Sequence, residues 1–261
     1  MAEYFLISFL ASIVGAICGI GGGVIIKPVM DLFRLETVST INFLSCCTVL
    51  SMSLYSVGKT MLAGEKKVEL RTGTPLALGA AIGGIFGKEL FQLVRQSFAD
   101  PDMVGAVQAG CLAAVTIGTL VYTLKRSRIR TRHVENLAGC IGIGLALGVM
   151  SSFLGIGGGP INLVVLYYFF SMDTKTAAAN SLYIILFSQA ASFFSTIVTH
   201  SVPAFHMGSL ALMVAGGIGG GIVGRAFNKK LDNRAVDRLF IGLMAVIIGI
   251  SLYNVYIGLT A

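Results

Sequence analysis

Long apolar runs dominate the chain, and short clusters of charged residues separate them. No charged residue falls between Glu36 and Lys59, and none falls between Lys175 and Arg225. A helix needs about 20 mostly apolar residues to cross a bilayer, so the second run is long enough for two crossings, with a break marked by Pro203. The pattern predicts spanning helices over residues 38–58, 72–93, 103–124, 176–199, 204–224 and 239–258.

Two further apolar runs are interrupted by clusters of glycine. One of them extends from Asn136 to Met172. As a straight helix it would be about 56 Å long, against a hydrocarbon core of about 30 Å. Two half-helices folded into a re-entrant hairpin fit better, with the glycines at a tip that protein or water must cover. We expect the second half-helices of the two hairpins over residues 24–33 and 160–171.

The glycine clusters belong to an internal repeat. Residues 18–23 (Cys-Gly-Ile-Gly-Gly-Gly) match residues 154–159 (Leu-Gly-Ile-Gly-Gly-Gly), and residues 83–88 match residues 220–225 in the same order. The offsets of 136 and 137 residues indicate a duplication. We therefore predict a first transmembrane repeat (1–124), a basic cytoplasmic linker (125–135) and a second transmembrane repeat (136–261).

The distribution of basic residues favours three crossings in each half. If the hairpins do not cross, the basic segments 59–71, 125–135 and 225–238 fall on one side and the uncharged turn around Pro203 falls on the other. Cytoplasmic loops are enriched in lysine and arginine, so we expect the basic segments to be cytoplasmic and both termini to be outside. Three crossings per half also invert the second repeat relative to the first.

Composition agrees with an all-α, polytopic membrane protein. Hydrophobic residues make up 55% of the chain and charged residues 12%, whereas a soluble domain carries about 25% charged residues. The five cysteines form no CxxC pair, and no arrangement of nucleophile and base or of metal ligands is visible. We therefore expect no catalytic residues, no metal and no cofactor.

The glycine tips carry the main functional signal. Glycine lets backbone amides approach a ligand, and a helix that begins at such a tip presents free N–H groups and the positive end of its dipole. In an inverted repeat the two tips are expected to meet near the midplane. The alternative is that the glycines only permit tight turns between close-packed helices. The candidate residues are Gly21, Gly22, Gly23, Gly157, Gly158 and Gly159.

Polar side chains inside apolar spans are further candidates. Amides and hydroxyls can bind an oxyanion and still release it, although interhelical hydrogen bonding is an equally good reading. Asn42 and Asn180 are paired across the repeat at an offset of 138. Lys27 is the cation nearest a predicted centre, and it either contributes charge there or extends to the interface. The polar candidates are Lys27, Asn42, Ser45, Asn180, Ser181 and Gln189.

Glycine also recurs every four residues on two predicted spans, at positions 79, 83 and 87 and at positions 216, 220 and 224. Such stripes favour close helix contact, and we expect each to seat the hairpin of its own half. Lys88 and Arg225 follow the stripes near helix ends, where we expect them to extend to the interface.

The doubled Gly-Ile-Gly-Gly-Gly motif, at residues 19–23 and 155–159, resembles the TauE/SafE sulfite exporter family, also called the sulfonate uptake permease family (TSUP). The resemblance covers nearly the whole chain and implies transport of sulfite, organosulfonates or related sulfur anions. One feature departs from a strict repeat. Pro160 directly follows the second motif, whereas Pro28 stands several residues after the first, so the two turns need not be equivalent.

Together these observations predict a multi-pass cell-membrane transporter of small sulfur-containing oxyanions such as sulfite and sulfoacetate, with the substrate held between the two tips. The expected partners are this anion and the lipid bilayer, and no nucleic acid. Direction, coupling ion and oligomeric state stay open. The alternative is a membrane-embedded assembly or scaffold protein whose glycines serve packing only.

Overall fold

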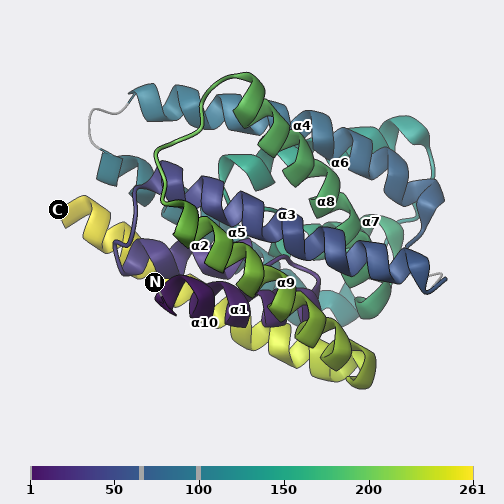
Figure 1. Ribbon diagram of the computed structural model, residues 1–261. Coiled ribbons are helices and arrows are strands. Elements are labelled where there is room, and N and C mark those ends of the chain that lie inside the picture. The colour runs from purple at the N-terminus through teal and green to yellow at the C-terminus, as the bar shows by residue number, and fades with distance from the viewer. Residues whose placement is uncertain (1, 65–67, 98–100, 261) are drawn as a thin grey trace.

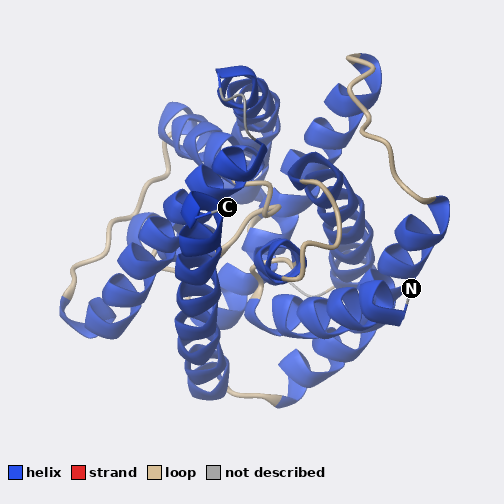
Figure 2. Ribbon diagram, turned by 90° about the vertical axis from the view of Figure 1, so that its left-hand side faces the viewer, coloured by secondary structure: helices blue, strands red, loops and turns tan. Residues whose placement is uncertain are grey.

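The computed structural model describes residues 2–64, 68–97 and 101–260, and these residues form helices and loops without a strand (Figures 1 and 2). Lys66 and Lys67 of the predicted basic segment lie outside the described residues. The α-helices are α1 (Ala2–Cys18), α2 (Gly23–Leu32), α3 (Val38–Leu62), α4 (Leu70–Ser97), α5 (Pro101–Lys125), α6 (Leu137–Phe153), α7 (Pro160–Phe170), α8 (Thr174–Val198), α9 (Met207–Lys230) and α10 (Asn233–Thr260).

Six helices within the described residues are long and apolar enough to cross a membrane, namely α3, α4, α5, α8, α9 and α10. They coincide with the six predicted spans and confirm the all-α, polytopic fold. The spans differ most at the end of α9, which is predicted at 224 but lies at Lys230, and at the start of α10, which is predicted at 239. α9 begins only at Met207, three residues later than predicted. α10 begins already at Asn233, where Asp232 Oδ1 accepts from the Ala235 amide at 2.9 Å and caps the helix.

The two broken runs form the hairpins α1–α2 and α6–α7. Their helices contain 17, 10, 17 and 11 residues, so none reaches across a core of about 30 Å at 1.5 Å per residue. The chain reverses at Gly19 and Gly155, whose φ angles of +76° and +65° suit glycine. The turns then diverge. Gly22 is helical, whereas Gly159 has a φ of +133°, because Pro160 disfavours the helical region for the residue before it.

The glycine stripes pack against the hairpins, but each stripe packs against the hairpin of the other half. A Cβ added at Gly79, Gly83 or Gly87 of α4 would overlap backbone carbonyls of α6, and one added at Gly220 or Gly224 of α9 would overlap carbonyls of α1. α4 accordingly lies along α6, and α9 lies along α1 (Figure 1). The expectation that a stripe holds the hairpin of its own half is wrong, because small residues define a contact face without defining its partner.

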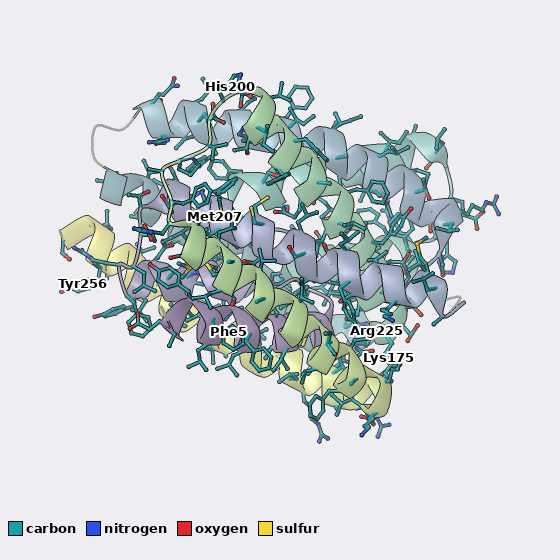
Figure 3. All side chains as sticks on the ribbon, viewed as in Figure 1. Phe5, Lys175, His200, Met207, Arg225 and Tyr256 are labelled. Carbon is teal, nitrogen blue, oxygen red and sulfur yellow. The ribbon has the colours of Figure 1, made fainter. Side chains whose placement is uncertain are left out.

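The basic segments gather at one end of the helix bundle, which we call the basic end. Arg71 lies 3.8 Å from Glu135 of the linker, and Arg126 lies 3.9 Å from Asp237 near the start of α10. The turn between α8 and α9 and both chain termini lie at the opposite end (Figures 1 and 3). This arrangement agrees with three crossings in each half.

The outward faces of the spanning helices carry large apolar side chains. Phe86 of α4, Val198 of α8 and Leu252 of α10 are all more than half exposed. Met207 and Tyr256, which are labelled in Figure 3, belong to the same apolar surface. Lipid tails accept such a surface, whereas water does not.

Candidate functional site

The two hairpin tips meet in the interior of the protein. A Cβ added at Gly21 would lie 3.4 Å from the carbonyl oxygen of Gly157, and one added at Gly158 would overlap the side chain of Ile185. All six candidate glycines are buried. The expected contact between the tips is therefore confirmed. In this arrangement the glycines face one another, apolar side chains such as Ile185, and the polar side chains of Ser12, Ser45 and Gln189.

A polar cavity of about 110 Å³ lies beside the second tip, and we call it the Asn42 cavity. It reaches the tip at Gly155 and lies between α3, α4, α6 and α8. Among the described residues that line it, none carries a carboxylate. Its polar lining consists of two cations, three amides and six hydroxyls: Lys88, Arg95, Asn42, Gln92, Gln189, Ser39, Ser151, Ser152, Ser192, Thr196 and Ser201.

The Asn42 cavity continues toward the end of the molecule that carries the α8–α9 turn. A wider hollow of about 640 Å³ shares five lining residues with it, namely Ser39, Gln92, Arg95, Ser201 and Pro203. We call this hollow the vestibule. The two spaces together form a route from that end of the bundle to Asn42.

Asn42 is held in place by Lys27. The Lys27 ammonium donates to Asn42 Oδ1 at 3.0 Å, and the Asn42 amide lies against Gly155, where an added Cβ would overlap it. An ammonium group only donates, so it fixes the oxygen of the Asn42 amide toward itself. The NH₂ group of Asn42 is then left to donate elsewhere, and Asn42 lines the cavity.

Lys27 itself lies behind the cavity wall. Its side chain is 2% exposed, its Nζ also donates to Gln108 Oε1, and Asp31 Oδ2 lies 3.9 Å away. Gln108 in turn donates to the Phe153 carbonyl oxygen at 2.5 Å, near the end of α6. Lys27 therefore neither lines the Asn42 cavity nor extends to the interface, and it acts as a positioning residue. Gln108 lies near the start of an apolar span, so the rule that singles out Asn42 also applies to it, but nothing in the sequence pattern links it with Lys27.

Lys88 extends toward the α8–α9 turn at its end of the bundle, in agreement with the prediction, and it also lines the Asn42 cavity. Its ammonium donates to Thr199 Oγ1 at 2.9 Å and to Ser201 Oγ at 2.8 Å. Both hydroxyls belong to the segment that joins α8 to α9. The cation is thus held at the cavity by neutral partners. Its repeat counterpart is also a cation, Arg225, and this match was the available signal for a role beyond anchoring.

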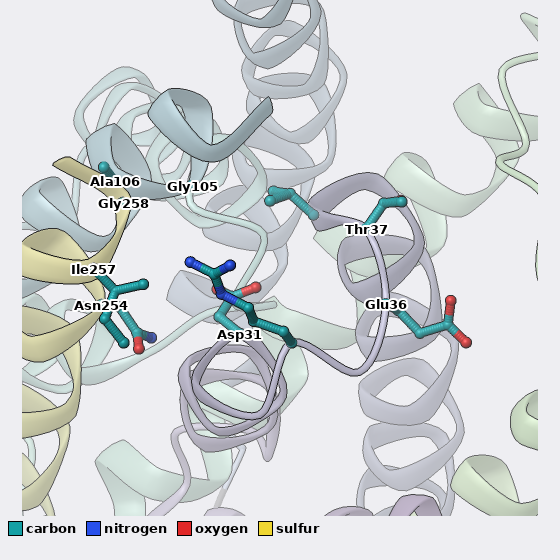
Figure 4. A pocket seen from close by; sticks show the side chains of 10 residues that line it. Asp31, Glu36, Thr37, Gly105, Ala106, Asn254, Ile257 and Gly258 are labelled. Carbon is teal, nitrogen blue, oxygen red and sulfur yellow. The ribbon is translucent and has the colours of Figure 1, made fainter. Parts of the chain in front are cut away.

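A separate cavity of about 290 Å³ lies between the end of α2 and helices α5 and α10 (Figure 4). Its lining includes the carboxylates of Asp31 and Glu36 together with Arg34. The Asn254 amide donates to the Pro28 carbonyl oxygen at 2.9 Å beside it. Two carboxylates disfavour a bound anion, so we do not assign this cavity to an anionic substrate although it is larger than the Asn42 cavity.

Three further polar candidates have different positions. Gln189 lines the Asn42 cavity, and its side chain lies next to Gly157. Ser45 and Ser181 are fully buried, and within the described part of the chain their hydroxyls have no hydrogen-bond partner. Neither serine lines the Asn42 cavity.

Asn180 lies apart from Asn42. Its Oδ1 accepts from the Glu69 amide at 3.0 Å, and its Nδ2 donates to the Thr176 carbonyl oxygen at 2.9 Å. These bonds place the side chain at the start of α4. The structure therefore does not bring the two asparagines together.

The tips also show which position corresponds to Asn42 in the second half. Asn42 covers Gly155 of the second tip, and Ala178 covers Gly19 of the first tip in the same way. Both pairs are related by the offset of 136 that relates the glycine motifs. The alignment of Asn42 with Asn180 is therefore wrong by two residues, because no local motif around them fixed the register.

Comparison with known proteins shows which kind of membrane protein has this geometry. Residues 4–252 match the family described as sulfite exporter TauE/SafE. The chain belongs to this family. Two curated bacterial relatives, both described as probable membrane transporter proteins, extend over nearly the same length. YunE of Bacillus subtilis (strain 168) is 25% identical over 95% of this chain and 95% of its own, and a Haemophilus influenzae protein is 25% identical over 90% of this chain and 88% of its own.

No solved structure matches this TauE/SafE family member. The family match and the six apolar helices make it a multi-pass transporter of the cell membrane. The resemblance carried by the doubled glycine motif is thereby confirmed. Its substrate is a small molecule, as expected of a transporter of this family.

Proposed function

We propose that this transporter carries small sulfur-containing oxyanions, such as sulfite and organosulfonates including sulfoacetate, and binds them in the Asn42 cavity. The observation that carries the proposal is the lining. Lys88 and Arg95 supply positive charge, and the amides and hydroxyls around them supply donors without a carboxylate among the described lining residues. Hydrogen bonds between such donors and a charged oxyanion are about twice as strong as neutral ones.

The hairpins add to the positive potential at this position. α2 and α7 both begin at the tips, so the positive ends of their dipoles point toward the region where the tips meet. Discontinuous helices act in this way on anionic substrates in other transporter folds. Gly155 places the second tip at the cavity wall, and the other tip glycines support the site from behind.

Size favours a small substrate. Ligand sites for drug-sized molecules usually measure about 300–1,000 Å³, whereas the Asn42 cavity measures about 110 Å³. A sulfite or sulfonate group suits this space, and the organic part of a sulfonate would extend into the vestibule. A scaffold protein, the alternative, needs no cavity lined by two cations and many donors, since polar groups in a membrane are costly.

The test is uptake by proteoliposomes that contain the purified full-length protein, with sulfite, sulfoacetate, taurine, thiosulfate and sulfate offered in turn. We expect saturable uptake of sulfite or a sulfonate. Asn42→Ala should weaken binding about 10- to 100-fold, because a hydrogen bond to a charged group contributes about 1.5–3 kcal/mol. Lys88→Gln should weaken it by at least as much.

Asn180→Ala is the matched control, because it also removes a buried amide from a spanning helix but lies outside the Asn42 cavity. We expect it to leave the affinity for the anion unchanged. Uptake of none of these anions would contradict the proposed substrate class. Equal effects of Asn42→Ala and Asn180→Ala would contradict the assignment of the site.

A further inference from the structure

A second small cavity lies at the basic end of the molecule, and nothing so far assigns a role to it. It measures about 40 Å³ and is lined by Lys175, Arg225 and Lys229 together with polar residues of α3 and α9. We call it the Arg225 cavity. Lys175 and Arg225 lie near each other in Figure 3, far from His200 in the turn between α8 and α9.

The two cavities are lined by corresponding positions of the repeat. Ser192 and Thr196 of α8 line the Asn42 cavity, and Ser56 and Thr60 of α3 line the Arg225 cavity. Each pair is related by the offset of 136 that also relates the glycine motifs. The hydroxyls that α8 contributes to one cavity are therefore contributed to the other by its counterpart, α3.

The cationic residues that line the two cavities also occupy corresponding positions of the repeat. Lys88 and Gln92 of α4 line the Asn42 cavity, and Arg225 and Lys229 of α9 line the Arg225 cavity. Here the offset is 137, as it is for the glycine stripes on the same helices. Two cavities found at opposite ends of the bundle thus share their construction, with Ala178 at the place of Asn42.

We propose that the Arg225 cavity is a second binding site for the transported oxyanion, reached from the basic end. This inference rests on the proposed function. Three cations and the hydroxyls of Ser56 and Thr60 line the cavity, and no carboxylate occurs among the described lining residues. The Ser56 hydroxyl is buried and lacks a hydrogen-bond partner within the described residues. It is a donor that an oxyanion would satisfy.

The chemistry of this second site differs from that of the first. Ala178 cannot donate a hydrogen bond, so the Arg225 cavity lacks the amide that Asn42 provides. Arg225 compensates, because a guanidinium group binds two oxygens of one oxyanion at once, whereas the ammonium of Lys88 acts as a point charge. The two sites therefore hold the same anion with different donors.

The sizes of the cavities describe the present state of the transporter. The Asn42 cavity connects to the vestibule of about 640 Å³, whereas the Arg225 cavity measures about 40 Å³. The space at the Arg225 cavity is thus the smaller one, and this cavity must widen to hold an oxyanion.

The proposal can be tested by measuring the affinity for sulfite separately at the two faces of the membrane. The full-length protein is measured in right-side-out and inside-out membrane vesicles, with sulfite supplied at one face at a time. Arg225→Gln should raise the half-saturating sulfite concentration at the basic face at least tenfold and leave the other face nearly unchanged. Asn42→Ala should do the reverse. Arg225→Lys should recover part of the affinity, because it keeps the cation.

Lys230→Gln is the control for general surface charge, since Lys230 belongs to the same basic segment but does not line the cavity. An effect of Arg225→Gln no larger than that of Lys230→Gln would overturn the second site. If Arg225→Gln fails to fold, Lys175→Gln takes its place with the same expected result. If the unsubstituted protein transports neither sulfite nor any of the sulfonates, the proposed function itself is refuted, so the two failures are distinguishable.

Discussion

At the scale of single residues, the site depends on a side chain that never reaches it. Lys27 lies behind the wall of the Asn42 cavity and fixes the direction of the Asn42 amide through one hydrogen bond. It is also paired with Asp31 at 3.9 Å. Substitution of Lys27 therefore affects two properties, the orientation of a binding residue and the balance of charge in the interior.

We predict that Lys27→Met lowers both stability and anion affinity. Removal of one partner from a fully buried ion pair costs about 3–5 kcal/mol, and we expect a smaller loss here because Asp31 is 15% exposed. The double variant Lys27→Met/Asp31→Asn should recover most of the melting temperature. It should not recover affinity, since Asn42 is no longer oriented.

Thermal melts and sulfite titrations of the two variants separate these effects. Recovery of both properties in the double variant would show that Lys27 matters for stability alone. Recovery of neither would show that Asp31 is not the charge that Lys27 compensates.

At the scale of helices, the amino-acid sequence predicts where the helices lie, but it does not predict which helices pack against each other. The uncharged runs located all six spanning helices, and the glycine motifs located both hairpin tips. The hydropathy of a run reports burial or contact with lipid, which is a local property. The partner of the glycine stripe on α4 is α6 of the other half, and no local pattern specifies this choice.

The same limit applies to the candidate site. Asn42 and Gln189 could be predicted because polar residues are rare in apolar spans, and both line the cavity. The sequence predicts that Lys88 extends toward the interface, but its place in the cavity lining depends on contacts with α8 that no local pattern specifies. Gln108 was missed because its contact with Lys27 joins residues far apart in the chain.

For the helix contact we predict that Gly83→Ala destabilises the protein by about 1–3 kcal/mol, because the added methyl overlaps a backbone carbonyl of α6 that cannot move aside alone. Gly118→Ala on α5 is the matched control, since an added Cβ there meets nothing within 4 Å. It should be neutral or stabilising by up to about 1 kcal/mol. Equal melting temperatures of the two variants would contradict the tight contact between α4 and α6.

At the scale of the whole molecule, charge defines an orientation in the membrane. The basic segments gather at one end, and the vestibule opens at the other. Because lysine and arginine concentrate in cytoplasmic loops, the basic end faces the cytoplasm in our proposal. The vestibule and the Asn42 cavity then open away from the cytoplasm.

Accessibility of single cysteines in a cysteine-free variant tests this orientation. Cysteines introduced at Ser127, Ala235 and the α8–α9 turn should react with a membrane-impermeant thiol reagent from the predicted sides. The first two should react only from the cytoplasmic face, and Ala204→Cys only from the outer face. Labelling of Ser127→Cys and Ala235→Cys from different faces would contradict three crossings in each half.

Each hairpin packs against the glycine-striped helix of the other half, and this arrangement has a consequence for biosynthesis. The α1–α2 hairpin leaves the ribosome first, but the helix that seats it, α9, begins only at Met207. Throughout the synthesis of the intervening chain, the hairpin must persist in the translocation machinery or the bilayer without its final neighbour. The first half therefore cannot mature on its own. Folding is completed only after the last helices are inserted. A truncated protein that lacks α9 would expose an α1–α2 hairpin without its packing partner to membrane quality control.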